Sequence, residues 1–330
     1  MNKSEISVAS ELFWIVSDQW MNLALWVYLV VIFIGGIILQ LIQFLQFIGS
    51  AHNNGFNYFL LQLTFADVIN LLLCYFDIFY IFSHEWIFGD DLCGIMSGLL
   101  NFSSTAITYV LLTMNLHAVS TANLACKALK IIQSEEEKSN FINEEVESTS
   151  DTYDTLEQKR TLTIDYSGPK WKTSINVIFP TLIIWILSLS ISMPTIIISA
   201  LNREFDENYC IILRSSFGAA EVFTTFVKII LPMLVFIPTI FILFRKRNML
   251  KKIEEHYIDE NPIEIIQITL IITITYLVLQ LPKIIFDIIS TIIETEHNKM
   301  FYMINCVFCI IYYLTILIRP ILIKSVKIRK

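Results

Sequence analysis

Ionisable side chains occur inside apolar stretches of this sequence, where a charge is costly unless it is paired or functional. Asp67 and Arg319 each lie within a long hydrophobic run. Gln280, Lys283 and Asp287 are three and four residues apart, so they share one face of a helix. Groups of this kind can bind a polar ligand, carry ions, or satisfy one another.

Two further helical stretches carry charged residues of the same kind. Glu221 and Lys228 share a helix face, and Asp77 lies in the outer half of another apolar run. With the charged face of residues 280–287, these residues could line a polar cavity that is open to the outside. Internal pairing as Lys283–Asp287 and Glu221–Lys228 is the alternative, and both can hold.

These residues must be positioned by membrane-spanning helices. The chain has 330 residues, 55% of them hydrophobic and 16% charged, whereas soluble domains carry about 25% charged residues. A spanning helix needs about 20 mostly apolar residues. Seven windows meet this length: 20–48, 57–82, 92–125, 174–201, 217–244, 265–293 and 300–323. We therefore predict an all-α membrane protein, a seven-transmembrane helix bundle.

The orientation follows from the connecting segments, because Lys and Arg are enriched on the cytosolic side. An extracellular N-terminus leaves only Lys3, Arg203, Arg214 and Lys299 outside. We expect residues 1–19 to be extracellular, 20–325 to form the helical domain and 326–330 to be a cytosolic tail, in the plasma membrane. Asn2 then begins an extracellular N-glycosylation sequon.

The segment 126–173 is the one long connector. It is acidic, rich in Ser and Thr, and poor in apolar residues. This composition predicts a largely disordered second cytosolic loop. A tolerated insertion and a phosphorylated or partner-binding loop are both open.

Charge and histidine content exclude several classes of function. The net charge of −7 argues against a nucleic-acid partner. The five histidines are scattered, so neither a metal site nor a zinc hydrolase is expected, and we expect no enzyme activity and no cofactor. A transporter that uses the intramembrane charges as a path is an alternative, although no inverted repeat is visible.

Several short motifs occur in order along the predicted helices: Leu63-Thr-Phe-Ala-Asp67, Trp86-Ile-Phe-Gly-Asp-Asp-Leu-Cys93, Trp185 with Pro194, and the prolines Pro232, Pro282 and Pro320. In this order they resemble the rhodopsin-like G-protein-coupled receptors over residues 20–325. The resemblance implies a receptor that binds an extracellular ligand in its bundle and signals to a G protein or arrestin. It also implies a disulfide between Cys93 and Cys210, the two cysteines in polar outer segments.

The switch motifs of that family are altered in this sequence. The positions of DRY, CWxP and NPxxY are held by His117-Ala118-Val119, Leu279-Gln280-Leu281-Pro282 and Arg319-Pro320-Ile-Leu-Ile323. A receptor with its own switch residues and an atypical receptor without ordinary G-protein coupling are both open.

The resemblance also suggests a partner for each isolated charge. In the family, the residues at the positions of Asp67 and Arg319 face each other across a sodium and water pocket. We predict an ion pair here, with the guanidinium fork in place of sodium. The alternative is that Arg319 extends toward the cytosolic headgroups.

The family's ligand-facing positions add to the candidate pocket. They are Leu100, Asn101, Ser104 and Thr105 in the third helix and Tyr302, Cys309 and Tyr313 in the seventh. Leu100 replaces the aspartate of amine receptors, and Tyr313 replaces the lysine that binds retinal. The outer segments are acidic, which favours a cationic ligand such as a basic peptide.

Overall fold

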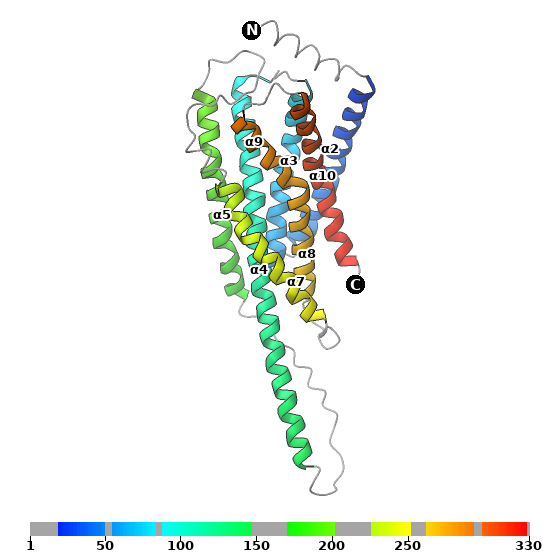
Figure 1. The fold of residues 1–330 in the computed structure, drawn as a ribbon, viewed down its shortest axis with the longest axis vertical. Helices are drawn as coiled ribbons and strands as arrows, with labels where there is room; N and C mark the ends of the chain where they lie inside the picture. Colours follow the sequence, from blue (N-terminus) through cyan, green and yellow to red (C-terminus); the bar gives the residue numbers. More distant parts are fainter. Residues whose placement is uncertain are drawn as a thin grey trace.

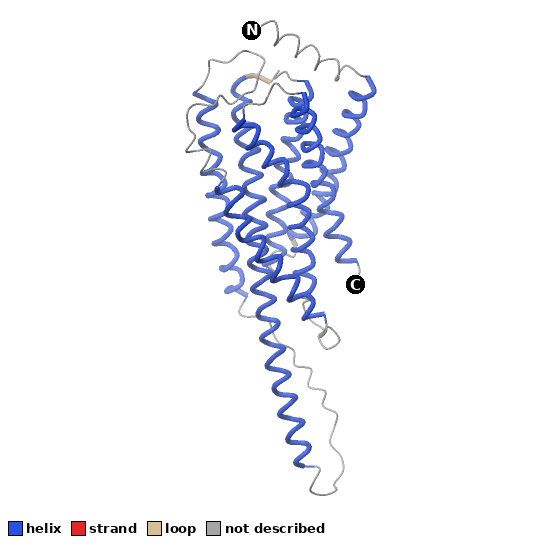
Figure 2. The backbone as a smooth tube through the Cα atoms, viewed as in Figure 1, coloured by secondary structure: helices blue, strands red, loops and turns tan. Residues whose placement is uncertain are grey.

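The computed structural model describes residues 19–49, 55–83, 88–146, 170–201, 226–251, 262–293 and 299–328, and its regular elements in these ranges are all helical (Figures 1 and 2). In chain order they are α2 (Gln19–Ile48), α3 (Gly55–Ser83), α4 (Asp90–Val146), α5 (Lys170–Leu201), η1 (Phe226–Ile230), α7 (Leu231–Lys251), α8 (Pro262–Thr275), η3 (Tyr276–Gln280), α9 (Leu281–Ile293) and α10 (Lys299–Ile328).

Six stretches of the described helices are long and apolar enough to cross a membrane. They are Trp26–Ile48, Gly55–Phe79, Leu92–Lys127, Phe226–Leu250, Pro262–Asp287 and Ile304–Val326. Each coincides with one of the seven predicted windows. In the remaining window, 174–201, the apolar part of α5 is shorter, Phe179–Pro194. The span predicted there and the orientation of the termini therefore stay predictions.

Apolar side chains cover the outside of these helices. On α7, Leu234, Ile237 and Phe241 are 64%, 68% and 70% exposed. A soluble protein would pay heavily for such a continuous apolar surface, whereas lipid tails accept it. Several polar side chains are buried instead, Asp67 and Arg319 among them. The chain is thus a helical membrane protein with a partly polar interior.

Helix α4 lies at the centre of the bundle, where it packs against α3, α5, α7 and α8. Helix α10 packs against α2, α3, α8, α9 and η3. The approach of α2 to its neighbours depends on Gly36, because a Cβ there would lie 2.8 Å from Leu71 Cδ1 and 3.4 Å from Ile316 Cγ2. Small residues allow this close contact between membrane helices.

Two spans widen into π turns shortly before a proline. Turn η1 ends two residues before Pro232, and η3 ends two residues before Pro282. Proline lacks the N–H that continues a helix, and in the wider spacing Pro232 leaves the carbonyl of Val227 without its donor. Tyr109 Oη donates to that carbonyl at 2.8 Å. A hydroxyl group from α4 therefore supplies the hydrogen bond that this carbonyl loses at the proline of the fifth predicted span.

The prediction of disorder from residue 126 onward is wrong for its first part. Helix α4 continues to Val146 and extends beyond the other helices (Figure 1). The segment 126–146 has no Gly or Pro and is rich in Glu, Lys and Ile, of which Glu and Lys favour helix strongly. Residues 147–169 lie outside the described part.

Candidate functional site

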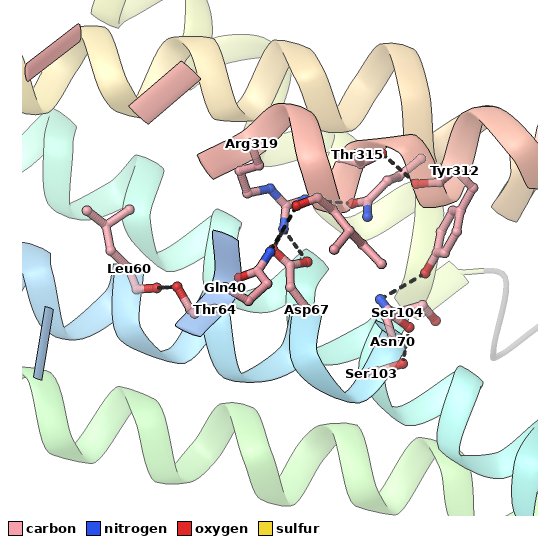
Figure 3. A network of polar contacts seen from close by, with 12 residues as sticks. Gln40, Leu60, Thr64, Asp67, Asn70, Ser103, Ser104, Tyr312, Thr315 and Arg319 are labelled. Atoms are coloured by element: carbon pink, nitrogen blue, oxygen red, sulfur yellow. Dashed lines mark hydrogen bonds and ion pairs between the residues drawn. The ribbon is translucent and has the colours of Figure 1, made fainter. Parts of the chain in front are cut away.

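An ion pair between Asp67 on α3 and Arg319 on α10 lies in the interior of the bundle (Figure 3). Arg319 Nη1 donates to both carboxylate oxygens of Asp67 at 2.6 Å. Its Nη2 donates to Gln280 Oε1 at 2.9 Å. Both charged side chains are only 1% exposed. The predicted pair is therefore present, and Arg319 does not extend to the surface.

The geometry of this pair differs from the predicted fork. One guanidinium nitrogen serves both oxygens of Asp67, and the other binds the amide of Gln280. Gln280, which the sequence placed in the candidate ligand pocket, thus belongs to the charged centre instead. We call Asp67, Arg319, Gln280 and Gln40 the inner network. Burying two charges is tolerated only when each has a partner.

Gln40 supports this centre from α2. Its side chain lies beside the Asp67 carboxylate (Figure 3), and its Nε2 donates to the carbonyl of Ile316 at 3.0 Å. Ile316 lies four residues before Pro320, which has no N–H to donate to it. The glutamine therefore satisfies the carbonyl that the proline leaves open, as membrane helices with proline require.

A second polar contact lies one turn along α3 (Figure 3). Asn70 Nδ2 donates to Tyr312 Oη at 3.2 Å, and Ser103 Oγ donates to Asn70 Oδ1 at 2.6 Å. This contact joins α3 to both α4 and α10. Asn70 and Ser103 are fully buried, so this contact, like the inner network, is not accessible to solvent.

Further toward the predicted outer side, Asp77 faces α10. Tyr313 Oη donates to Asp77 Oδ2 at 2.8 Å, and Cys309 Sγ donates to the same oxygen at 3.7 Å. Both donors are neutral. Asp77 is also within electrostatic range of Lys283 on α9. The structure thus brings together three predicted pocket residues and holds a carboxylate with no cation in direct contact among the described residues.

Helix α9 carries a second ion pair, which lies in the predicted outer half of the bundle. Lys283 Nζ donates to Asp287 Oδ1 at 2.5 Å, and their side chains are 11% and 50% exposed. The predicted internal pairing of these two residues is confirmed. Lys228 on η1 lies within electrostatic range of Asp287, but it makes no hydrogen bond with the described residues. We call Asp77, Lys228, Lys283 and Asp287 the outer cluster.

The candidate residues on α4 contribute less than predicted. Ser104 and Thr105 donate to the carbonyl of Asn101 in their own helix, at 3.1 and 2.7 Å. Leu100 packs in an apolar cluster with Leu73 and other side chains. These contacts stabilise the helix and its packing. They leave the outer cluster as the main polar feature of the predicted pocket.

Some predicted sites lie outside the described residues. These are Asn2, Cys210 and Glu221, and the side chain of Tyr302 is also not described. Cys93 lies buried in the first turn of α4. This helix begins directly after Gly89, whose φ of +84° suits only glycine well. Cys74, Cys126, Cys306 and Cys309 are free thiols. Because Cys210 lies outside the described residues, the Cys93–Cys210 disulfide stays a prediction.

The predicted coupling region lies toward the far end of the apolar part of α4, Leu92–Lys127. The His117 ring contacts Phe56 and Phe59 of α3, with centroids 6.3 and 5.7 Å apart. Ala118 is fully buried against residues of α7 and α8, and Val119 packs at the edge of the same cluster. This end of the bundle is therefore filled by apolar packing. No cluster of metal-binding side chains occurs in the described residues.

Sequence reasoning missed four residues of the polar contacts around Asp67 and Asn70: Gln40, Asn70, Ser103 and Tyr312. A signal existed for two of them. Gln40 is a glutamine within an uncharged span, and Asn70 lies three residues after Asp67 on the same helix face. Ser103 and Tyr312 gave no such signal, because Ser and Tyr are common in membrane helices and can bond within their own helix.

Comparison with known proteins adds no family assignment. No protein-family model matches the chain, and no curated protein matches it. The resemblance to rhodopsin-like receptors therefore depends on the motifs of this sequence alone.

Proposed function

We propose that this chain is a receptor of the plasma membrane that binds an extracellular ligand in the outer half of its helix bundle and signals to the cytosol. In this proposal α5 completes a seven-helix domain with an extracellular N-terminus, and Cys93 pairs with Cys210 over the binding site. The order of motifs along the helices supports the kinship with rhodopsin-like G-protein-coupled receptors.

One observation carries the proposal: charges in the two halves of the bundle are partnered differently. The inner network is 1% exposed and its two charges neutralise each other. In the outer cluster, Asp77 and Lys228 lack a charged contact partner in the described structure, and the Asp287 side chain is half exposed. Charged residues inside a membrane that are not paired with one another indicate a functional site.

The same difference argues against a transporter. A charged path would have to connect the outer cluster to the cytosolic side, but the inner network is closed and the end beyond it is packed with Ala118, Leu243 and Leu270. The replaced switch residues favour a second candidate, an atypical receptor without ordinary G-protein coupling. Gln280 and Arg319, which stand at two switch positions, bind each other in a buried pair.

The deciding experiment is a recruitment assay of the full chain in cells, with labelled G proteins and arrestins and a peptide library. A receptor that couples gives ligand-dependent recruitment of at least one of them. Ligand that is bound and internalised without any recruitment identifies the atypical receptor. Net transport of a library compound across vesicles that contain the purified chain would contradict the proposal.

A further inference from the structure

The outer cluster contains alternating charges on three elements of the bundle. Asp77 on α3 is within electrostatic range of Lys283 on α9, Lys283 is bonded to Asp287, and Asp287 is within range of Lys228 on η1. The sequence of charges is negative, positive, negative, positive. The middle two form one ion pair. Among the described residues, the charges without a contact partner of opposite sign are therefore the two ends.

The two ends differ in what they can accept. Asp77 is held by the Tyr313 hydroxyl and the Cys309 thiol, which orient one carboxylate oxygen but do not neutralise it. Lys228 donates to no described residue, and Asp287, the acid within its range, is bonded to Lys283. A cation completes the first end and an anion completes the second.

We infer that the ligand of this site carries both an ammonium group and a carboxylate, as a free amino acid or a short peptide with free termini does, and that Asp77 binds the ammonium while Lys228 binds the carboxylate. This inference rests on the proposed function. It differs from the sequence-based expectation of a basic peptide, because a ligand that carries only positive charges offers no anion to Lys228. Charge-assisted hydrogen bonds of this kind are strong in a site of low dielectric constant.

The test uses the purified full chain in lipid nanodiscs and measures thermal stabilisation by free amino acids and unmodified dipeptides. At least one of them should give saturable binding. Its N-acetylated and C-amidated analogues should each bind about tenfold more weakly or worse, since each lacks one charged hydrogen-bonding group.

Two variants assign each group to its partner. Asp77→Asn should weaken the unmodified ligand as much as N-acetylation does, and should add no further loss for the N-acetylated analogue. Lys228→Gln should behave in the same way toward the C-amidated analogue. Lys324→Gln, on an exposed position of α10, is the control and should change neither affinity. Tyr313→Phe, which only removes the hydroxyl that orients Asp77, replaces Asp77→Asn if that variant is not folded.

The outcomes separate this inference from the proposed function. Failure of every zwitterion to bind, or equal affinity for the modified and unmodified compounds, overturns the inference. If a purely cationic peptide gives recruitment with a potency that Lys228→Gln leaves unchanged, the ligand class is wrong and the receptor proposal stands. Net transport of the bound zwitterion would instead overturn the receptor proposal while the ligand assignment stands.

Discussion

The inner network and the outer cluster use the same kinds of side chain with different results. Asp67 and Arg319 are 1% exposed, and Arg319 also donates a hydrogen bond to Gln280. Lys283 and Asp287 make an equally direct bond, yet their side chains are 11% and 50% exposed. Burial rather than residue type therefore separates a structural pair from a chemically available one.

The partners of each region lead to the same distinction. In the inner network each charge meets its opposite, and Gln40 also satisfies the carbonyl that Pro320 leaves open. In the outer cluster the contacts of Asp77 within the described part of the chain are a hydroxyl and a thiol. The two charges of the inner network neutralise each other, whereas Asp77 in the outer cluster has no charged contact partner in the described part of the chain. Four measurements can break or sharpen this comparison.

The largest effect is expected from breaking the inner pair. Asp67→Asn or Arg319→Met should each destabilise the protein by about 3–5 kcal/mol, because the remaining charge stays buried without its partner. The double variant should be more stable than either single variant. The measurement is the melting temperature of the detergent-solubilised chain, together with its surface expression.

The outer pair supplies the matched control for that experiment. Lys283→Met and Asp287→Asn should each cost no more than about 1 kcal/mol, since half of the Asp287 side chain is exposed and the pair is correspondingly weak. Single inner variants with unchanged melting temperature and expression would show that the buried pair does not hold the bundle together.

The sequence predicted the charged contacts better than the neutral ones. A charge in an apolar span must find an opposite charge, and few candidates exist, so Asp67–Arg319 and Lys283–Asp287 could be paired in advance. Gln40, Asn70 and Tyr312 have no such obligation. Their partners depend on which face each helix turns inward and on the carbonyl released at Pro320, and neither can be obtained from local sequence.

Helix boundaries show a similar limit. Six spans followed from the length of the apolar runs, because lipid thickness sets the length of the helix. The acidic composition of 126–146 predicts disorder, whereas the structure extends α4 to Val146. The helix propensity of Lys and Glu, combined with an already formed helix that can propagate, is the better guide there.

A second measurement tests whether the inner half is also packed more tightly. Gly36→Val should destabilise the bundle by about 1–3 kcal/mol, because its Cβ would lie 2.8 Å from the buried Leu71 side chain. Leu71→Ala in the same chain should recover part of the loss. Gly49→Val, where a Cβ has no neighbour within 4 Å, is the control and should stay within about 0.5 kcal/mol of the parent. Equal melting temperatures for the two valine variants would contradict the close packing.

The third measurement concerns the carbonyl of Ile316. Gln40→Leu should cost about 1–3 kcal/mol, because a buried carbonyl then lacks a donor. Pro320→Ala restores a backbone N–H at the position that can serve Ile316, so in that background Gln40→Leu should cost less. The coupling between the two substitutions is obtained from chemical or thermal unfolding of the four chains. Additive effects would mean that Gln40 and Pro320 act independently.

The fourth measurement has the smallest expected effect: the melting temperature should not depend on sodium. The resemblance to rhodopsin-like receptors implies a sodium pocket beside Asp67, but Arg319 Nη1 binds both oxygens of that carboxylate at 2.6 Å. An ion that binds only the folded state raises stability with its concentration. Replacing sodium chloride with choline chloride at constant ionic strength should therefore leave the melting temperature unchanged. A rise specific to sodium would mean that the cation competes with Arg319 for Asp67, and that the inner half is open to a ligand after all.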